Sequence, residues 1–134
     1  MKITLPLHLQ RKIGGKKYAL NMNSYRNNHF QINNWIKKTL KDIVLAEILS
    51  SKEWKGKKQL KTPLTVNYVL YLGNNRKSDL SNWLAVIDKF FLDSLTELGY
   101  IPDDNIDFVN EINFVFGGVD KNKARVEVIV VEST

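Results

Sequence analysis

The chain has 134 residues and no cysteine, which is enough to bury the core of one domain and excludes disulfides and thiolate metal sites. No apolar run approaches the roughly 20 residues that cross a bilayer, and residues 1–7 lack the apolar core of a secretory signal, so we expect one soluble, cytoplasmic domain over residues 1–134 with no membrane partner. Residues 1–62 carry 14 Lys and Arg and three Asp and Glu, a net charge of +11, whereas residues 63–134 carry six Lys and Arg and 11 Asp and Glu, a net charge of −5. This separation of charge favours a protein that binds a polyanion with its basic half and a metal ion with its acidic half.

The first elements along the chain are predicted to be short. Residues 1–7 alternate apolar and polar side chains, which indicates a strand, and Pro6 places that strand at a sheet edge or ends it. The Gly14–Gly15 step lies among lysines and arginines and indicates a basic hairpin turn into a short strand at 17–21. Residues 21–34 are rich in asparagine and are predicted to form a polar loop.

A long helix is predicted to begin at Phe30 or Asn33 and to end at Leu49, because apolar residues recur there at steps of three and four. Its buried stripe consists of Trp35, Ile36, Leu40, Ile43, Val44 and Ile48. Its solvent-exposed face is expected to carry Lys37, Lys38 and Lys41. These lysines either meet phosphates or form an ordinary solvated surface.

Residues 52–61 are rich in lysine and are predicted to form an exposed basic loop. In one interpretation Lys55, Lys57 and Lys58 contact the phosphates of a nucleic acid and Trp54 stacks on an unpaired base. In the other, the loop is a mobile linker and Trp54 folds onto the core of the domain.

The second half of the chain begins with a strand and a helix. Residues 63–72 alternate and are rich in β-branched and aromatic side chains, which indicates a strand. The helix is predicted over residues 82–98, because apolar residues again recur with helical spacing. Asp79 or Ser81 can cap its start, and Gly99 marks its end.

Two further strands are predicted after this helix. Residues 106–116 alternate with a break near Asn110, residues 117–122 form a hairpin connection, and residues 124–131 form the returning strand. The fold class is therefore expected to be α+β, with a small mixed β-sheet covered by two main helices.

Two acidic motifs flank the helix of the second half. Asp79-Leu80-Ser81-Asn82 stands where the helix begins, and Asp103-Asp104 follows it in a turn. These motifs resemble those of the RusA-type Holliday junction resolvases of phages and prophages, which carry D-x-D-N opening a helix and D-D after it. The similarity runs over about 21–131 and is most specific over 78–105.

The resemblance implies a RusA-like, dimeric protein with a divalent-metal-dependent endodeoxyribonuclease activity. Its substrates would be Holliday junctions and other branched DNA in recombination, repair or phage DNA processing, inside a bacterial or phage-infected cell. Mg²⁺, or Mn²⁺, is expected at Asp79 and Asp104 first and at Asp103 second. Ser81 stands where the family has a second aspartate. Magnesium keeps several waters and needs only one or two protein carboxylates.

The resemblance also assigns the basic residues. The lysine that the family often places one turn into the helix aligns with Ala85, and Lys89, one turn further on the same face, is the expected substitute in catalysis. Arg76 and Lys77 are expected to contact the DNA backbone. Arg26 lies in a segment that resembles an N-terminal signature of the family, and it is expected to contact DNA as well.

Other interpretations of the same residues stay open. Asp79 is also an ordinary helix cap, and Pro-Asp-Asp-Asn is an ordinary turn sequence. Because Ser81 removes one carboxylate, the alternative function is a junction-binding module with weak or no cleavage. A structural or protein-interaction role would show no salt-sensitive DNA binding.

The predicted helix separates the two acidic motifs. A helix of about 17 residues spans about 25 Å, so Asp79 and Asp104 begin far apart. We therefore expect another part of the chain or a partner subunit to complete the metal site. A homodimer with two-fold symmetry would also match the near two-fold symmetry of a four-way DNA junction.

Overall fold

The computed structural model describes residues 1–134. The elements in chain order are β1 (Lys2–Leu5), β2 (His8–Gln10), β3 (Lys17–Ala19), α1 (Met22–Asn27), α2 (Phe30–Ser50), the 3-10 turn η1 (Lys52–Trp54), β4 (Leu64–Leu72), α3 (Leu80–Glu97), β5 (Val109–Val119) and β6 (Arg125–Val131). No helix combines the length and the hydropathy of a membrane span.

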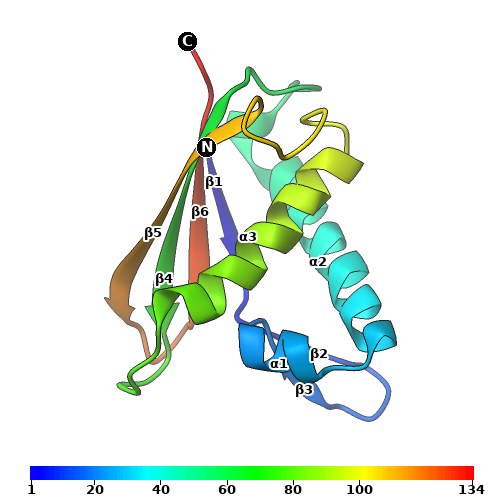
Figure 1. Ribbon diagram of the computed structural model, residues 1–134, viewed down its shortest axis with the longest axis vertical. Helices are drawn as coiled ribbons and strands as arrows, with labels where there is room; N and C mark the ends of the chain where they lie inside the picture. Colours follow the sequence, from blue (N-terminus) through cyan, green and yellow to red (C-terminus); the bar gives the residue numbers. More distant parts are fainter.

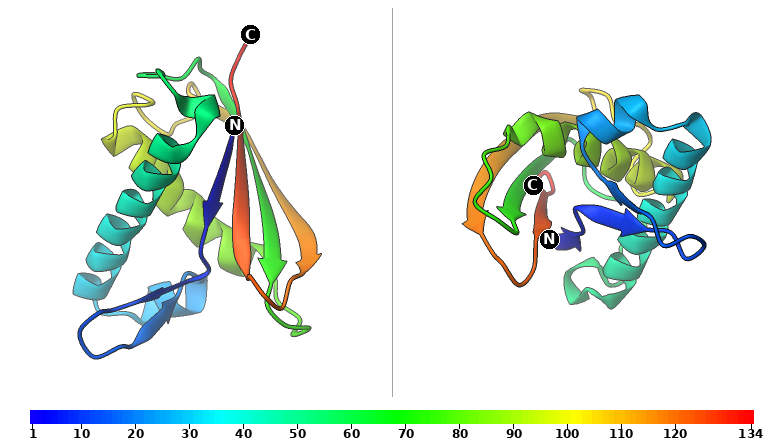
Figure 2. Two further views of the ribbon diagram at one scale, coloured as in Figure 1. Left: turned by 180° about the vertical axis from the view of Figure 1, so that it is seen from behind. Right: turned by 90° about the horizontal axis from the view of Figure 1, so that it is seen from below.

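Four of the strands form a mixed sheet in the order β1-β6-β4-β5 (Figure 1). β4 and β5 are parallel and are joined through α3, whereas β6 runs antiparallel to both β4 and β1. The α2 and α3 helices cover one face of this sheet (Figure 2). β2 and β3 form a separate ribbon near α1. The expected α+β class, with a mixed sheet and two main helices, is confirmed.

The core lies between the sheet and the two long helices. Alternate residues of β4 are buried, from Leu64 to Leu72, because a strand points successive side chains to opposite faces. The predicted stripe of α2 is confirmed in its central residues, which are Ile36, Leu40, Val44 and Ile48. Trp35 and Ile43 are only partly buried at its margin.

The polar loop predicted over residues 21–34 is wrong, since this segment holds α1 and the first turn of α2. The Oδ1 atom of Asn21 accepts a hydrogen bond from the backbone N–H of Ser24 at 2.9 Å, which caps α1. Tyr25 packs its ring edge-on against Phe90 of α3, with ring centroids 5.9 Å apart. The asparagines therefore cap and flank a short helix whose stability comes from packing on α3 rather than from helix propensity.

The hairpin predicted between the last two strands is also wrong. β5 and β6 do not pair, because β4 lies between them in the sheet. The chain returns from α3 to the free edge of β4 in a parallel crossover, so β6 has to take the other edge of β4. β5 also begins later than expected, at Val109, and Ile106 is 82% exposed in the preceding turn.

Candidate functional site

The candidate site lies at the beginning of α3, where the chain leaves β4 through residues 73–78. Asp79 occupies the N-cap position of α3, and its carbonyl oxygen accepts the N–H of Asn82 at 3.1 Å. Its carboxylate makes no capping hydrogen bond. Because the side chain is exposed and free of the helix, the interpretation of Asp79 as an ordinary cap does not account for its carboxylate.

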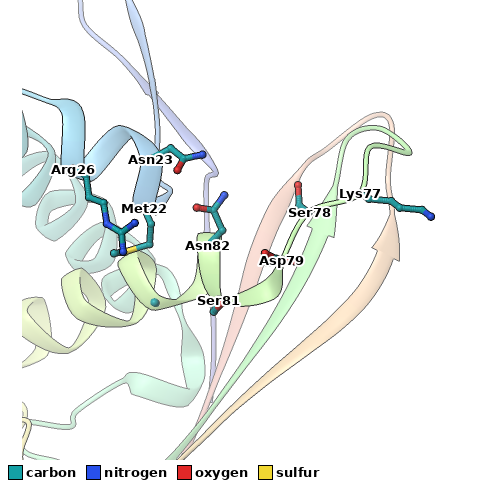
Figure 3. Close-up of a pocket in the computed structure, with 9 residues that line it drawn as sticks. Met22, Asn23, Arg26, Lys77, Ser78, Asp79, Ser81 and Asn82 are labelled. Carbon is teal, nitrogen blue, oxygen red and sulfur yellow. The ribbon is translucent and has the colours of Figure 1, made fainter.

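A cavity of about 760 Å³ opens beside this carboxylate, between α1 and the first turn of α3 (Figure 3). Arg26 approaches it from α1, and Lys77 comes from the loop on the opposite side of Asp79. The lining residues are Met22, Asn23, Arg26, Lys77, Ser78, Asp79, Ser81, Asn82 and Ala85. The cavity thus combines two cations with one carboxylate, hydroxyls and amides, a set that suits a phosphate group and a hard metal ion.

The acidic pair after α3 is placed elsewhere. Asp103 accepts hydrogen bonds from the backbone N–H of Asp104 at 2.8 Å and from the side chain of Asn105 at 3.0 Å. The first of these bonds is the main reason why the pKa of Asp103 is lowered. Neither Asp103 nor Asp104 lines the cavity that contains Asp79.

The length of α3 explains this separation. Its 18 residues correspond to about 27 Å between the two ends. The carboxylates that interact with Asp104 are those of Asp103, of Asp93 in the C-terminal half of α3 and of Asp88 in its middle. Loss of hydration and then the hydrogen bond with Asp103 raise the pKa of Asp104. The structure therefore does not bring the predicted ligands Asp79 and Asp104 together within one chain.

Asp88, in the middle of α3, is a carboxylate that the sequence reasoning missed. Its Oδ1 atom accepts a hydrogen bond of 2.5 Å from the hydroxyl of Tyr68, which is buried on β4. Burial raises the pKa of Asp88, the bond from Tyr68 opposes this shift, and the charge of Asp104 adds to it. The sequence pattern could have identified Asp88, because Asp88 follows Ser81 by seven residues and therefore lies on the same face of the helix.

These carboxylates do not form a complete metal-binding site on their own. No group of three or more histidine, aspartate and glutamate side chains is arranged to hold a metal ion. An ion bound at Asp79 would therefore take its remaining ligands from hydroxyls, waters and substrate oxygens.

The predicted basic residues fall into two separate groups. Arg26 and Lys77 line the cavity at the start of α3. Lys55 and Lys57 instead line a hollow with Tyr100, which follows the C-terminal end of α3. Lys57 is also paired there with Glu132, at 2.5 Å.

The remaining basic candidates are exposed. Lys58 follows η1 and is next in sequence to Lys57 of this second group, and Arg76 lies in the loop before α3. Lys89 is exposed on α3 one turn beyond Ala85 and does not line the cavity. Of these three, Arg76 and Lys89 are close in sequence to the candidate site, whereas Lys58 is not.

Two interpretations that the sequence left open in the basic half are decided by the structure, and for Trp54 the packing onto the core is confirmed. Trp54 is only 2% exposed and packs edge-on against Tyr100, with ring centroids 5.5 Å apart, so its ring is not available to stack on a base. On α2, Lys37 and Lys41 both form ion pairs with Glu97, at 3.0 and 3.1 Å. These two lysines connect the long helices and are not a free phosphate-binding surface.

Comparison with known proteins adds no family to this description. A scan against protein-family models and a search of curated proteins both give no match. The features of this chain that bear on function are therefore the cavity at the start of α3 and the motif residues Asp79, Ser81 and Asn82 that line it.

Proposed function

We propose that the protein is a divalent-metal-dependent endodeoxyribonuclease of the RusA type, which resolves Holliday junctions and other branched DNA in recombination, repair or phage DNA processing. The observation that carries this proposal is the cavity that Asp79, Ser81 and Asn82 line together with Arg26 and Lys77. An enzyme of this kind would act on DNA in the cytoplasm of a bacterial or phage-infected cell.

The two cations would hold the DNA backbone. The guanidinium of Arg26 can donate two parallel hydrogen bonds to one phosphate, and Lys77 adds a point charge on the other side of Asp79. Contacts of this type fix the position of a strand without reading its sequence. Specificity for branched DNA would then come from the shape of the junction, and binding would weaken steeply as salt rises.

The oxygen atoms around the cavity fit a hard divalent ion. Asp79 offers a carboxylate, and Ser78 and Ser81 offer hydroxyls, which are ligands that Mg²⁺ and Mn²⁺ accept. When bound, such an ion supplies an activated water and stabilises charge on the phosphate. Asp79 would hold the ion while Arg26 and Lys77 orient the phosphate beside it.

The proposed enzyme acts as a homodimer. Asp104 and Asp103 do not reach the cavity of their own chain, so they would serve catalysis only if another subunit or another part of the site brings them to the ion. A homodimer with two-fold symmetry would carry two equal sites, which suits two matched cuts in a four-way junction.

The decisive experiment compares a synthetic four-way junction with a linear duplex, with and without Mg²⁺ or Mn²⁺. The expected result is a pair of symmetric nicks at the junction that require the metal. Asp79→Asn should abolish the nicks and leave binding of the junction intact. Asp42→Asn makes the same change at an exposed position of α2 and should cleave like the unmodified protein. Equal cleavage by both variants would remove Asp79 from the mechanism.

The alternative is a module that binds junctions with weak or no cleavage, because Ser81 replaces the second aspartate of the family. It is favoured by one observation, namely that Asp79 is the only carboxylate lining the cavity. Salt-sensitive binding of the junction without nicks in either metal would identify this function. Absence of any DNA binding would refute both functions.

A further inference from the structure

A second hollow, of about 500 Å³, adjoins the candidate site. Lys77 and Ser78 line both cavities, so the two spaces meet at this loop. The second hollow differs from the first in its chemistry, because its apolar lining consists of Leu72, Leu80, Phe116 and Val119. Arg76 joins Lys77 at its margin. A volume of this size lies within the usual range for small-molecule sites, about 300–1,000 Å³.

Phe116 is an exposed aromatic residue on the edge strand β5. Phe116 is 50% exposed and Val119 is 41% exposed, both near the C-terminal end of the edge strand β5. Their partners in the sheet, Leu70 and Leu72, are buried. The aromatic ring of Phe116 therefore lines an apolar hollow and stays accessible to solvent, as a stacking platform requires.

The charge around this ring favours one kind of occupant. Arg76 and Lys77 are exposed, and no acidic side chain lines the hollow. A ligand that carries a flat apolar ring next to a negative charge would match both features. A nucleotide with an unpaired base has this chemistry, and the point where a branched DNA opens is a source of unpaired bases.

We propose that the second hollow binds one unpaired nucleobase, stacked on Phe116, of a DNA strand whose neighbouring phosphate lies at Lys77. This inference depends on the proposed function, and it adds a site for the base next to the site for the phosphate. Arg76 holds the next phosphate of the same strand. The stacking role that the sequence suggested for Trp54 is thereby assigned to an aromatic ring that is exposed.

The test measures binding of the full chain to two DNAs without added metal. One is a forked DNA with 2-aminopurine at the unpaired position, and the other is a fully paired duplex of the same length. The unmodified protein should quench the fluorescence of the 2-aminopurine, because a stacked base loses emission. Phe116→Ala should lose the quenching and weaken binding to the fork by roughly 10-fold, with duplex binding unchanged.

Two further variants separate stacking from packing. Phe116→Trp should keep the quenching, since it retains an aromatic face. Val115 lies next to Phe116 on the other face of β5 and is 48% exposed. The Val115→Ala variant shortens this side chain and should bind both DNAs like the unmodified protein. Thermal unfolding of each variant checks that the fold is retained.

The other outcomes overturn the inference in distinguishable ways. If the unmodified protein binds the fork and Phe116→Ala binds it equally well, the hollow is not a base site, although the proposed function stands. If the unmodified protein binds no DNA, the proposed function fails together with the inference. If Phe116→Ala instead converts a dimer to a monomer in analytical ultracentrifugation, the second hollow is a contact between two copies of the chain.

Discussion

The hydrogen bond between Tyr68 and Asp88 joins the sheet to α3, and its removal gives a measurable loss of stability. Tyr68 is buried on β4, and its ring lies edge-on to Phe91 and Phe114, with centroids 6.2 and 5.8 Å away. Tyr68→Phe keeps this packing and removes only the hydroxyl that donates to Asp88 at 2.5 Å. The carboxylate of Asp88 then stays half-buried without its donor.

The expected cost follows from the type of bond. A hydrogen bond to a charged group contributes about 1.5–3 kcal/mol, so Tyr68→Phe should lower the free energy of unfolding by about 2 kcal/mol near pH 7. For a domain of this size, this corresponds to a fall in Tm of about 6–10 °C. Urea denaturation followed by tryptophan fluorescence measures the difference.

The pH dependence provides a second check. Burial raises the pKa of Asp88 in the folded protein, so the folded state still holds this proton when the unfolded state has lost it. The stability that Asp88 contributes therefore falls as pH rises from its unfolded pKa, about 3.9, through its folded pKa. Asp88→Asn keeps an acceptor for Tyr68 and cannot ionise, so its stability relative to the unmodified protein should increase from pH 4 to pH 7.

Two results would refute this reasoning. One is a Tyr68→Phe variant that unfolds at the same urea concentration as the unmodified protein at pH 7. The other is a constant difference in stability between Asp88→Asn and the unmodified protein across the pH range. The first result would mean that the carboxylate of Asp88 gains nothing from Tyr68. The second would mean that burial does not raise the pKa of Asp88 above its unfolded value.

Three more predictions concern the sheet edge and the candidate site. In Gly117→Ala, the new Cβ atom would lie 2.7 Å from Val69 and from the ring of Tyr71, so thermal unfolding should show a loss of about 1–3 kcal/mol from overpacking. Ser81→Asp adds a carboxylate to the cavity and should lower the metal concentration needed for junction cleavage, whereas Ser81→Asn, measured in the same titration, should not. Asp104→Asn should abolish cleavage and keep gel-shift binding of the junction; unchanged cleavage would show that this residue has no part in the reaction.

The elements with a strong local pattern could be predicted from the sequence. The helix α2 begins at Phe30 and ends at Ser50, and α3 ends at Glu97, just before Gly99 with its positive φ of 84°. β4 lies where the alternation of residues 63–72 indicates it. Helical periodicity, strand alternation and glycine stops act within a few residues of the chain, so they can be recognised without tertiary contacts.

The motif at the start of α3 could also be found in the sequence, but its surroundings could not. Asp79 and Ser81 follow the strand directly, whereas Arg26 reaches the same cavity from α1, more than 50 residues earlier in the chain. The helix α1 itself was predicted as a loop, because its stability comes from packing on α3 and not from its own six residues.

The sequence by itself determined the class of the fold, the two long helices and the chemical types of residue that flank α3. Only the tertiary structure decided that β4 separates β5 from β6, that Trp54 is buried, and that the charge of Asp104 acts on Asp88 while Asp104 does not line the cavity of Asp79. The physical reason is the range of the interactions. Periodicity and capping are properties of neighbouring residues, whereas strand partners, burial and the meeting of side chains depend on contacts between segments that are distant in the sequence.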